Sequence, residues 1–131
     1  MIAIDNTFMI IDDDKGFRSC ISSIIKKYHL GVILASCGDG LEAESLIRAY
    51  RPAVVVIDLL LPGQSGIEVT KKLAAARDET AFIMVSACSN PALIAQAYYS
   101  GVDFYLPKPV NVLDFIAVVT KASKSKEGTL W

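Results

Sequence analysis

The sequence has no long apolar run and no excess of charge of either sign. None of its apolar runs approaches the roughly 20 residues that a membrane-spanning helix needs. Its 13 basic residues are balanced by 14 acidic ones, which gives no support to sequence-independent binding of nucleic acid or of a membrane surface. The N-terminus has no basic start and meets acidic residues too early for a secretory signal peptide. These absences favour a cytoplasmic protein.

Cysteine is also scarce. The chain has three cysteines, an odd number, and Cys20, Cys37 and Cys88 have neither a CxxC pattern nor the spacing of metal ligands. We therefore expect buried thiols in a reducing compartment rather than disulfides. With 131 residues, 53% of them hydrophobic, the chain is long enough for one domain with a substantial core.

Five short apolar runs recur along the chain, and the middle ones are β-branched and continuously apolar. Such runs are typical of strands that are covered on both faces of a sheet. The predicted strands are FMII (8–11), VILA (32–35), VVVI (54–57), AFIMV (81–85) and FYL (104–106).

The segments between and after these runs have apolar residues at helical spacing. Phe17, Ile21 and Ile24 mark the first such helix, and Phe115 and Val119 mark the last. Parallel strands need crossovers of about a dozen residues, which these segments supply. The pattern predicts a doubly wound α/β fold: a five-stranded parallel sheet between two layers of helices.

Polar residues follow four of the predicted strands. Asp12 and Asp13 come after the first strand, Asp58 after the third, Ser86 after the fourth and Lys108 after the fifth. In a parallel sheet all of these positions lie at the carboxyl edge, where such folds bind ligands. A single charged residue at a strand end is common, but four strands that each deliver a polar group predict a site.

These residue types suit phosphoryl transfer with a hard cation. Carboxylates bind Mg²⁺ through oxygen, while a lysine and a hydroxyl can hold phosphoryl oxygens. One carboxylate can then act as a nucleophile and form an acyl phosphate. The sequence has no GxxxxGK[ST] motif, so a nucleotide P-loop is not predicted. We interpret Gly63 and Gly66, which follow Asp58, as turn residues.

Four motifs occur in order over residues 6–123: IIDDD, VVVIDLLLPGQSGIEV, FIMVSA and GVDFYLPKPV. Together they resemble the receiver domain of bacterial two-component response regulators. The resemblance implies a flavodoxin-like (βα)5 sandwich with strand order 2-1-3-4-5. It also implies a receiver domain at 6–123, followed by a tail or the start of a linker at 124–131.

The resemblance also implies roles for the acidic residues. Asp58 would be the phosphoacceptor, which receives its phosphoryl group from a histidine kinase or from a small donor such as acetyl phosphate. Asp13 would bind Mg²⁺ directly and Asp12 would bind it through water. Asp58 and the backbone carbonyl of Leu60 would complete the protein ligands. The third aspartate, Asp14, is expected at the start of the following helix, by capping or by its charge.

The other site residues take their expected roles from the same resemblance. Lys108 would pair with the phosphoryl group, and Ser86 would hydrogen-bond to it and move inward. Tyr105 matches the aromatic switch position, and the Lys108–Pro109 bond resembles the family's cis peptide, which proline makes accessible. The domain would catalyse its own phosphorylation and dephosphorylation rather than serve as an enzyme for other substrates.

A phosphatase of the haloacid-dehalogenase type is the alternative. Asp12, Asp14, Ser86 and Lys108 could fill the roles of its DxD motif, hydroxyl and lysine. Such an enzyme needs a further acidic pair after the lysine, and only two acidic residues follow Lys108. The alternative also leaves Asp58 unexplained. A degenerate receiver that only binds partners would typically lack one of the site residues, and here all are present.

Two departures from typical receivers and one surface give further hypotheses. Leu60 and Cys88 flank the path of a hydrolytic water in receivers, and neither is a good general base, so we expect a long-lived phosphorylated form. The segments 91–101 and 112–119 are more apolar than sheet-covering helices need to be. We expect the 91–123 face to dock an output domain, a target protein or, after phosphorylation, a second copy. Neither direct nucleic-acid binding by this domain nor membrane binding is expected.

Overall fold

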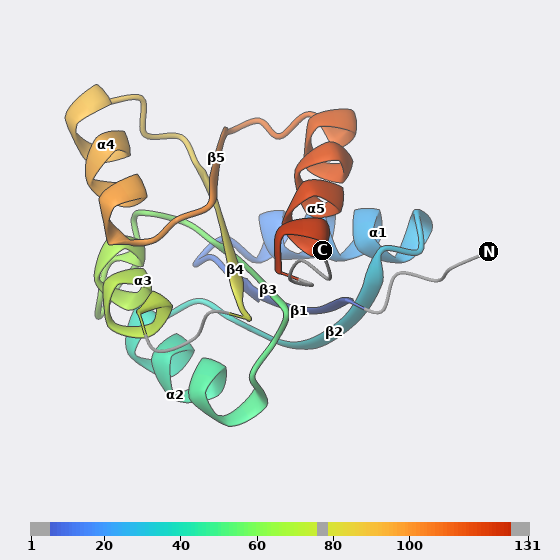
Figure 1. Cartoon of the computed structure of the whole chain (residues 1–131), viewed down its shortest axis with the longest axis horizontal. Helices are drawn as coiled ribbons and strands as arrows, with labels where there is room; N and C mark the ends of the chain where they lie inside the picture. Colours follow the sequence, from blue (N-terminus) through green and yellow to red (C-terminus); the bar gives the residue numbers. More distant parts are fainter. Residues whose placement is uncertain (1–5, 76–78, 127–131) are drawn as a thin grey trace.

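The computed structural model describes residues 6–75 and 79–126 of the chain. Five strands alternate with five helices, and Figure 1 shows the sheet between the helices. The strands are β1 (Asn6–Ile11), β2 (Gly31–Cys37), β3 (Val54–Ile57), β4 (Ala81–Ser86) and β5 (Phe104–Pro107). The helices are α1 (Lys15–Lys27), α2 (Gly40–Tyr50), α3 (Gly66–Ala74), α4 (Pro91–Ser100) and α5 (Val112–Lys126).

All strand pairs in the sheet are parallel, and the strand order is β2-β1-β3-β4-β5. The predicted doubly wound fold and its strand order are therefore confirmed. β1 lies inside the sheet and pairs with β3 from Phe8↔Val54 to Ile11↔Ile57. On its other side β1 pairs with β2, with a register irregularity between Phe8 and Met9. β2 and β5 form the two edges.

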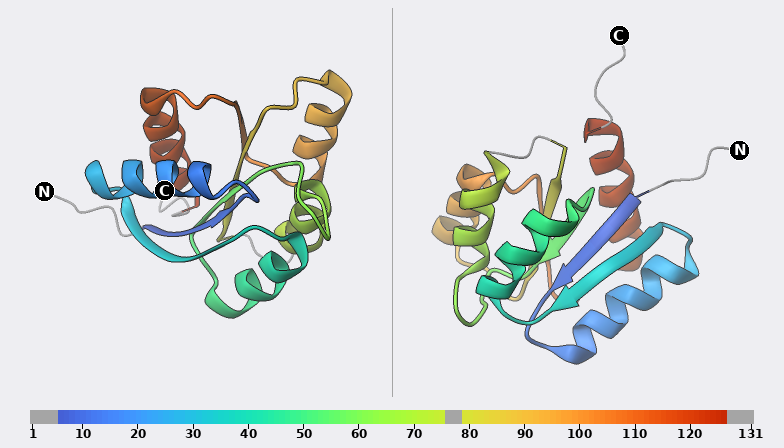
Figure 2. Two further views of the ribbon diagram at one scale, coloured as in Figure 1. Left: turned by 180° about the vertical axis from the view of Figure 1, so that it is seen from behind. Right: turned by 90° about the horizontal axis from the view of Figure 1, so that it is seen from below.

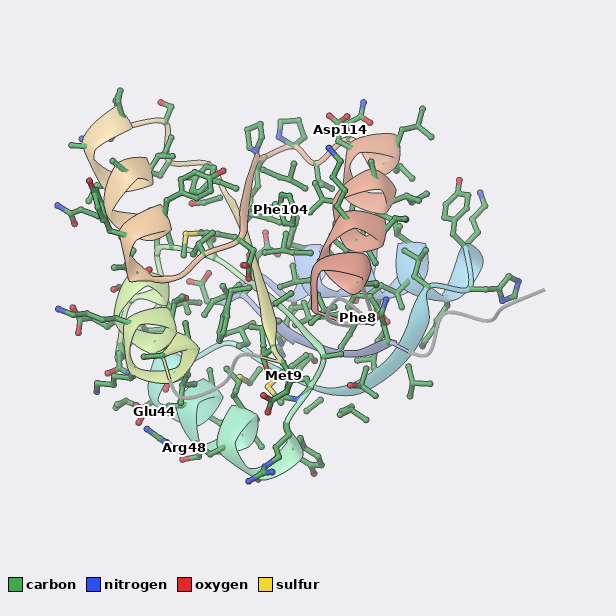
Figure 3. The ribbon with its side chains drawn as sticks, in the orientation of Figure 1. Phe8, Met9, Glu44, Arg48, Phe104 and Asp114 are labelled. Atoms are coloured by element: carbon green, nitrogen blue, oxygen red, sulfur yellow. The ribbon has the colours of Figure 1, made fainter. Side chains whose placement is uncertain are left out.

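The sheet separates two hydrophobic clusters. Phe8 and Ile10 of β1 pack in the cluster that α1 and α5 cover, whereas Met9 and Ile11 pack in the cluster under α2, α3 and α4. Figure 2 shows these two helix layers on opposite faces, and Figure 3 labels Phe8 and Met9 on either side of the sheet. Successive side chains of a strand point to opposite faces, so continuously apolar strands supply both clusters.

Side-chain caps fix the start of all five helices; at α5, Asn111 Oδ1 accepts a hydrogen bond from Asp114 N–H at 3.0 Å. Asp14 caps α1 by accepting hydrogen bonds from the backbone N–H groups of Gly16 and Phe17, as the sequence predicted. The equivalent caps of α2, α3 and α4 are Asp39, Ser65 and Asn90. Because each of these caps ends a loop that leaves the carboxyl edge of the sheet, the caps also help to fix the loops around the site.

One expectation needs correction at the periphery. Cys37 is buried, but Cys20 is exposed because it lies on the solvent side of α1, and Cys88 is only half-buried. Helix α5 extends to Lys126, so residues 124–126 of the predicted tail or linker are helical, and residues 127–131 lie outside the described residues. Within the described ranges, none of the helices is long and apolar enough to span a membrane.

Candidate functional site

The carboxyl ends of four neighbouring strands bring the predicted polar residues to one edge of the sheet. Asp12 follows β1, Asp58 follows β3, Ser86 ends β4 and Lys108 follows β5. These strands are adjacent in the order β1-β3-β4-β5, so residues far apart in sequence become neighbours. The predicted convergence at this edge is confirmed by the geometry below.

Three carboxylates form the acidic part of the site. One oxygen each of Asp12, Asp13 and Asp58 lies within 4.8 Å of the others. Asp12 is 1% exposed and Asp58 is 7% exposed, whereas Asp13 is exposed to solvent. Two buried carboxylates this close to a third repel one another unless a cation lies between them.

Lys108 supplies one cation. Its Nζ lies 2.7 Å from Asp12 Oδ2 and 3.0 Å from Asp58 Oδ2, and it donates a hydrogen bond to each. The ammonium group also lies 4.3 Å from the centre of the Phe17 ring, a cation–π contact. The peptide bond from Lys108 to Pro109 is cis, and Lys108 N–H donates to the Ser86 carbonyl at 2.9 Å. The sequence predicted a lysine at this edge but not its bridge between two aspartates.

The pKa values at the site reflect burial and pairing. Burial raises the pKa of Asp12 above its ordinary value, although the hydrogen bond from Lys108 opposes that rise. Burial lowers the pKa of Lys108, but its hydrogen bonds to Asp12 and Asp58 outweigh burial, so its pKa is raised overall. The lysine therefore stays protonated at neutral pH while the proton affinity of the buried aspartate rises.

Backbone contacts hold the two buried carboxylates in place. Asp12 N–H donates to the Cys37 carbonyl and Asp58 N–H donates to the Ile11 carbonyl, both at 3.0 Å. Asp12 Oδ1 accepts from Asp14 N–H at 2.9 Å, and Asp58 Oδ1 accepts from Leu60 N–H at 3.3 Å. Each carboxylate is thus oriented from its own loop as well as by Lys108.

Gly66 packs α3 directly under Asp58. A Cβ atom at this position would overlap the Asp58 carbonyl oxygen and lie 3.1 Å from the Cα of Leu59. Gly66 N–H donates to the Leu59 carbonyl at 2.9 Å. Our interpretation of Gly66 as a turn residue is therefore wrong: it is the first residue of α3, and it is small because helix and loop touch there. Gly63, with φ of 79°, does occupy a left-handed turn.

Ser86 and Tyr105 lie beside the acidic residues on the β4 and β5 side. Ser86 is buried, and its Oγ accepts from Cys88 N–H at 3.3 Å. Tyr105 is half-buried, its hydroxyl donates to the Cys88 carbonyl at 2.6 Å, and burial raises the pKa of that hydroxyl. A residue that the sequence did not single out, Tyr98 of α4, accepts from Tyr105 N–H at 3.1 Å. Only its spacing on an apolar helix could have drawn attention to it.

One residue that the phosphatase alternative requires, Asp14, does not join the others at the site. The carboxylate of Asp14 caps α1 and lies among exposed groups, outside the cluster of Asp12, Asp13 and Asp58. A DxD motif needs its second aspartate in the metal site. The alternative is therefore not supported.

The donor set fits a hard divalent cation. All three carboxylates offer oxygen, the ligand that Mg²⁺ prefers, and the exposed Asp13 leaves room for water ligands. Together with Lys108, three carboxylates leave two uncompensated negative charges. This is the charge that one divalent ion would neutralise.

Fold and site together define a doubly wound α/β protein with an acidic pocket at the carboxyl edge of its sheet. The chain belongs to the response regulator receiver domain family, whose model matches residues 8–120. It is thus a receiver domain of two-component signalling, as the sequence motifs predicted.

Known relatives agree with this assignment. The chain is 28% identical over 121 residues to the transcriptional regulatory protein GlnL of Bacillus subtilis, which covers 92% of this chain and 38% of GlnL. It is 30% identical over 109 residues to the response regulator MprA of Mycobacterium sp. (strain KMS), which covers 83% of this chain and 46% of MprA. The chain therefore spans less than half the length of either relative.

A solved structure agrees as well. The DNA-binding response regulator of the LuxR family from Staphylococcus aureus superimposes with a TM-score of 0.85 at 27% sequence identity. The superposition covers 90% of this chain and 98% of that one. The match extends over almost the whole fold described above, including the strands that carry the site.

Proposed function

We propose that Asp58 accepts a phosphoryl group from a sensor histidine kinase, or from acetyl phosphate, in a Mg²⁺-dependent reaction. The observation that carries this proposal is the pairing of Lys108 with Asp58 and Asp12 at 3.0 and 2.7 Å in a buried acidic pocket. One Asp58 oxygen is held by the backbone N–H of Leu60, and the other lies against the ammonium group. The carboxylate is thereby oriented for attack on phosphorus.

Asp13 is proposed to bind Mg²⁺ directly and Asp12 to bind it through water, with Asp58 and the Leu60 carbonyl as further ligands. The ion, when bound, neutralises phosphoryl oxygens and so makes the approach of an anionic donor to an acidic pocket favourable. Lys108 shares this task because it can hold another phosphoryl oxygen without leaving the pocket.

In the transfer step an Asp58 carboxylate oxygen forms a bond to phosphorus while the phosphorus–nitrogen bond of the donor's phosphohistidine breaks. The electron pair stays with the imidazole, which takes up a proton from solvent. Hydrolysis of the acyl phosphate returns inorganic phosphate and the Asp58 carboxylate. We propose that the domain catalyses both steps on itself.

Phosphorylation is proposed to switch Ser86 and Tyr105. The Ser86 hydroxyl would turn from Cys88 N–H to a phosphoryl oxygen, which draws the loop after β4 inward. Tyr105 is tied to the same loop through the Cys88 carbonyl, so a movement of the loop displaces its hydroxyl. The Tyr98 hydroxyl would transmit that displacement to α4.

The face formed by residues 91–123 is proposed to carry the output. Tyr99 is 93% exposed and Leu113 is 76% exposed, which is unusual for large apolar side chains unless a partner covers them. The partner would be an output domain, a target protein or a second phosphorylated copy. We further propose residues 6–123 as the receiver unit, 124–131 as a tail or linker, and the cytoplasm as its location, where its free thiols are stable.

The central test is the intact mass of the protein after incubation with acetyl phosphate and Mg²⁺. We expect the addition of one phosphoryl group, and none in Asp58→Asn or in the presence of EDTA. Asp114→Asn, which removes an exposed carboxylate at the start of α5, is the matched control and should be phosphorylated like the wild type. No added mass, or addition that survives Asp58→Asn, would refute the proposal.

The proposed dimer has its own test. Sedimentation velocity with Mg²⁺ and beryllofluoride, a phosphoryl mimic, is expected to show a dimer that the untreated protein does not form. Tyr99→Ser should weaken that dimer while leaving phosphorylation by acetyl phosphate intact. If the protein is the same monomer with and without the mimic, phosphorylation-driven dimerisation is excluded. Docking of an output domain or a target protein on the same face would still be compatible with that result.

A further inference from the structure

Helix α1 is cationic although the protein as a whole is nearly neutral. Its sequence, KGFRSCISSIIKK, contains four basic residues and no acidic one. Lys15, Arg18, Ser22 and Lys26 succeed one another at steps of three and four residues, so they share one side of the helix. The mechanism proposed above does not use this side of α1.

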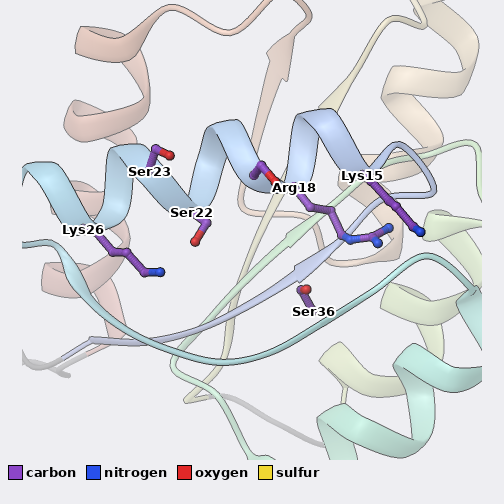
Figure 4. Close-up of a pocket in the computed structure, with 7 residues that line it drawn as sticks. Lys15, Arg18, Ser22, Ser23, Lys26 and Ser36 are labelled. Atoms are coloured by element: carbon purple, nitrogen blue, oxygen red, sulfur yellow. The ribbon is translucent and has the colours of Figure 1, made fainter.

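A groove of about 440 Å³ runs along this side, between α1 and β2. It is lined by the three cations Lys15, Arg18 and Lys26, by three serines of α1, and by the exposed Ser36 of β2. Figure 4 shows Lys26, Ser22, Arg18 and Lys15 along the helix, with Ser36 below it. Of the described residues that line the groove, none is acidic, so its walls offer positive charge and hydroxyl donors only.

Ser36 belongs to the edge strand β2, whose register with β1 is irregular opposite Phe8 and Met9 but which lacks two other common protections against pairing. β2 ends the sheet, spans seven residues, and has neither proline nor a charged side chain in the sequence GVILASC. Val32 is 62% exposed on it. Edge strands in native proteins are typically blocked by such residues, because their free N–H and C=O groups can accept another strand.

The backbone of Ser36 is oriented for such pairing. The Cys37 carbonyl accepts a hydrogen bond from Asp12 N–H, so Cys37 directs its backbone groups toward the inside of the sheet. Consecutive residues of a parallel strand direct these groups to opposite sides. Ser36 therefore presents its N–H and C=O at the outer edge, next to the cations of α1.

The spacing of the cations distinguishes an extended ligand from a compact one. Lys15 and Lys26 are eleven positions apart, which corresponds to about 16 Å along the helix. A single phosphate group cannot reach both. An extended peptide covers that distance with about five residues, since a strand rises about 3.3 Å per residue.

We propose that the groove between α1 and β2 is a docking site for an extended acidic segment of a partner protein. The segment lies along β2 and pairs with its free edge, while its carboxylates face Lys15, Arg18 and Lys26. The C-terminal sequence KASKSKEGTLW (121–131) does not suit this groove, because it is basic and the groove is lined by cations. The site is separate from Asp58 and does not depend on phosphorylation.

The test is fluorescence anisotropy with a labelled octapeptide of alternating glutamate and threonine, and the full chain as receptor. We expect saturable binding that weakens with added salt. The double variant Lys15→Gln/Lys26→Gln should bind about two- to thirtyfold more weakly, since exposed ion pairs contribute about 0.2–1 kcal/mol each. Arg18 is left unchanged because it donates to the Asp12 carbonyl beside the acidic pocket.

The matched control is Lys71→Gln/Lys121→Gln, which removes the same charge from exposed lysines of α3 and α5. It should bind the peptide like the wild type, as should Asp58→Asn. In ¹H–¹⁵N spectra the peptide should shift amides of 31–37 and of α1. The proposal is overturned if the peptide does not bind, or if both double variants lose affinity equally. It is also overturned if inorganic phosphate displaces the peptide at equal ionic strength, or if the free protein forms a dimer through β2.

Discussion

At the scale of single residues, Lys108 compensates part of the negative charge of the buried carboxylates. Its ammonium group contacts two buried carboxylates and the Phe17 ring, so three parts of the chain depend on one side chain. An uncompensated pair of buried carboxylates would favour protonation over ionisation. Burial is the main reason why the pKa of Asp12 is raised. Because the Lys108 ammonium group lies between Asp12 and Asp58, the two carboxylates do not need to share a proton.

We expect the lifetime of the phosphorylated form to depend on Leu60 and Cys88. Leu60 is 60% exposed and Cys88 is half-buried, and neither side chain can orient or deprotonate an attacking water. We expect Leu60→Asn and Cys88→Glu, alone and combined, to shorten the phosphoryl half-life by about tenfold or more. General-base assistance typically accelerates a reaction by about 10²–10⁴. The measurement is loss of the phosphoryl mass with time after removal of acetyl phosphate.

Two controls separate hydrolysis from stability. Leu60→Ala and Cys88→Ser remove the apolar side chains without adding a base, and should leave the half-life within about twofold. An unchanged half-life in Leu60→Asn/Cys88→Glu would contradict the assignment of these positions.

The convergence of the polar residues at one edge of the sheet was predictable from the sequence, but their contacts were not. The positions of Asp12, Asp58, Ser86 and Lys108 after strands were enough, because parallel strands share one carboxyl edge. The cap by Asp14 also follows from local sequence. The bridge of Lys108 between two aspartates could not be predicted, because it depends on side-chain rotamers and on distances between loops far apart in sequence.

At the scale of elements, the start of α3 determines how closely a helix can approach the loop that carries Asp58. We expect Gly66→Ala to lower the free energy of unfolding by about 1–3 kcal/mol, because the added methyl overlaps the Asp58 carbonyl and the helix must shift. Phosphorylation by acetyl phosphate should slow as Asp58 is displaced. Urea unfolding and the initial phosphorylation rate are the measurements.

Gly16→Ala is the matched control within another helix. A Cβ atom there meets only the Asp14 side chain at 3.2 Å, which can adjust, and alanine favours helix by about 0.5–1 kcal/mol over glycine. The variant should be as stable as the wild type or more so. Equal effects of the two substitutions would show that space at Gly66 is not limiting.

Glu44 links α2 to α3 through a small polar network. It accepts hydrogen bonds from Gln64 at 3.0 Å and Arg48 at 3.1 Å, and pairs with Lys72 at 3.5 Å; Figure 3 labels Glu44 and Arg48 on α2. The hydrogen bond from Gln64, followed by that from Arg48, lowers the pKa of Glu44. A lowered pKa means that ionised Glu44 stabilises the folded state above its ordinary value of 4.5, and that this contribution is lost as pH falls through the folded value.

Glu44→Gln should therefore lower the melting temperature slightly at neutral pH, by an amount that vanishes as pH falls below 4.5. Differential scanning calorimetry from acidic to neutral pH measures the difference. Glu42→Gln, in the first turn of the same helix, is the control for loss of charge alone. A Glu44→Gln difference that persists or grows in acid would contradict the network's role.

The existence of every strand and helix was predictable from apolar runs and helical spacing, but several ends were not. β2 begins one residue earlier and ends two later than predicted, because pairing with β1 continues into polar Ser36 and Cys37. Helix α5 continues into the polar sequence after residue 123. In both cases neighbouring elements extend a structure that local composition does not indicate.

At the scale of the whole molecule, we expect Mg²⁺ to stabilise the fold. At a tenfold excess over its dissociation constant, an ion that binds only the folded state adds about 1.4 kcal/mol, or roughly 4–6 °C in melting temperature. Lys108→Met should be less stable than the wild type in EDTA, because Asp12 and Asp58 lose their internal cation. Mg²⁺ should restore more stability to this variant than it adds to the wild type.

The measurement is thermal unfolding by circular dichroism with EDTA or Mg²⁺ at constant ionic strength. Asp13→Asn should reduce the Mg²⁺ effect without large loss of stability, because Asp13 is exposed. A melting temperature that Mg²⁺ leaves unchanged in all three proteins would contradict the metal site.

The separation of the core into two clusters has a consequence for biosynthesis. The cluster under α2, α3 and α4 consists of residues up to Val102, with Tyr105 at its margin, so nearly all of it leaves the ribosome before α5 does. The opposite cluster needs Phe115, Val119 and Ala122. The helices on one face of the nascent sheet can therefore pack during synthesis. On the other face, Phe8 and Ile10 are not covered by α5 until that helix emerges.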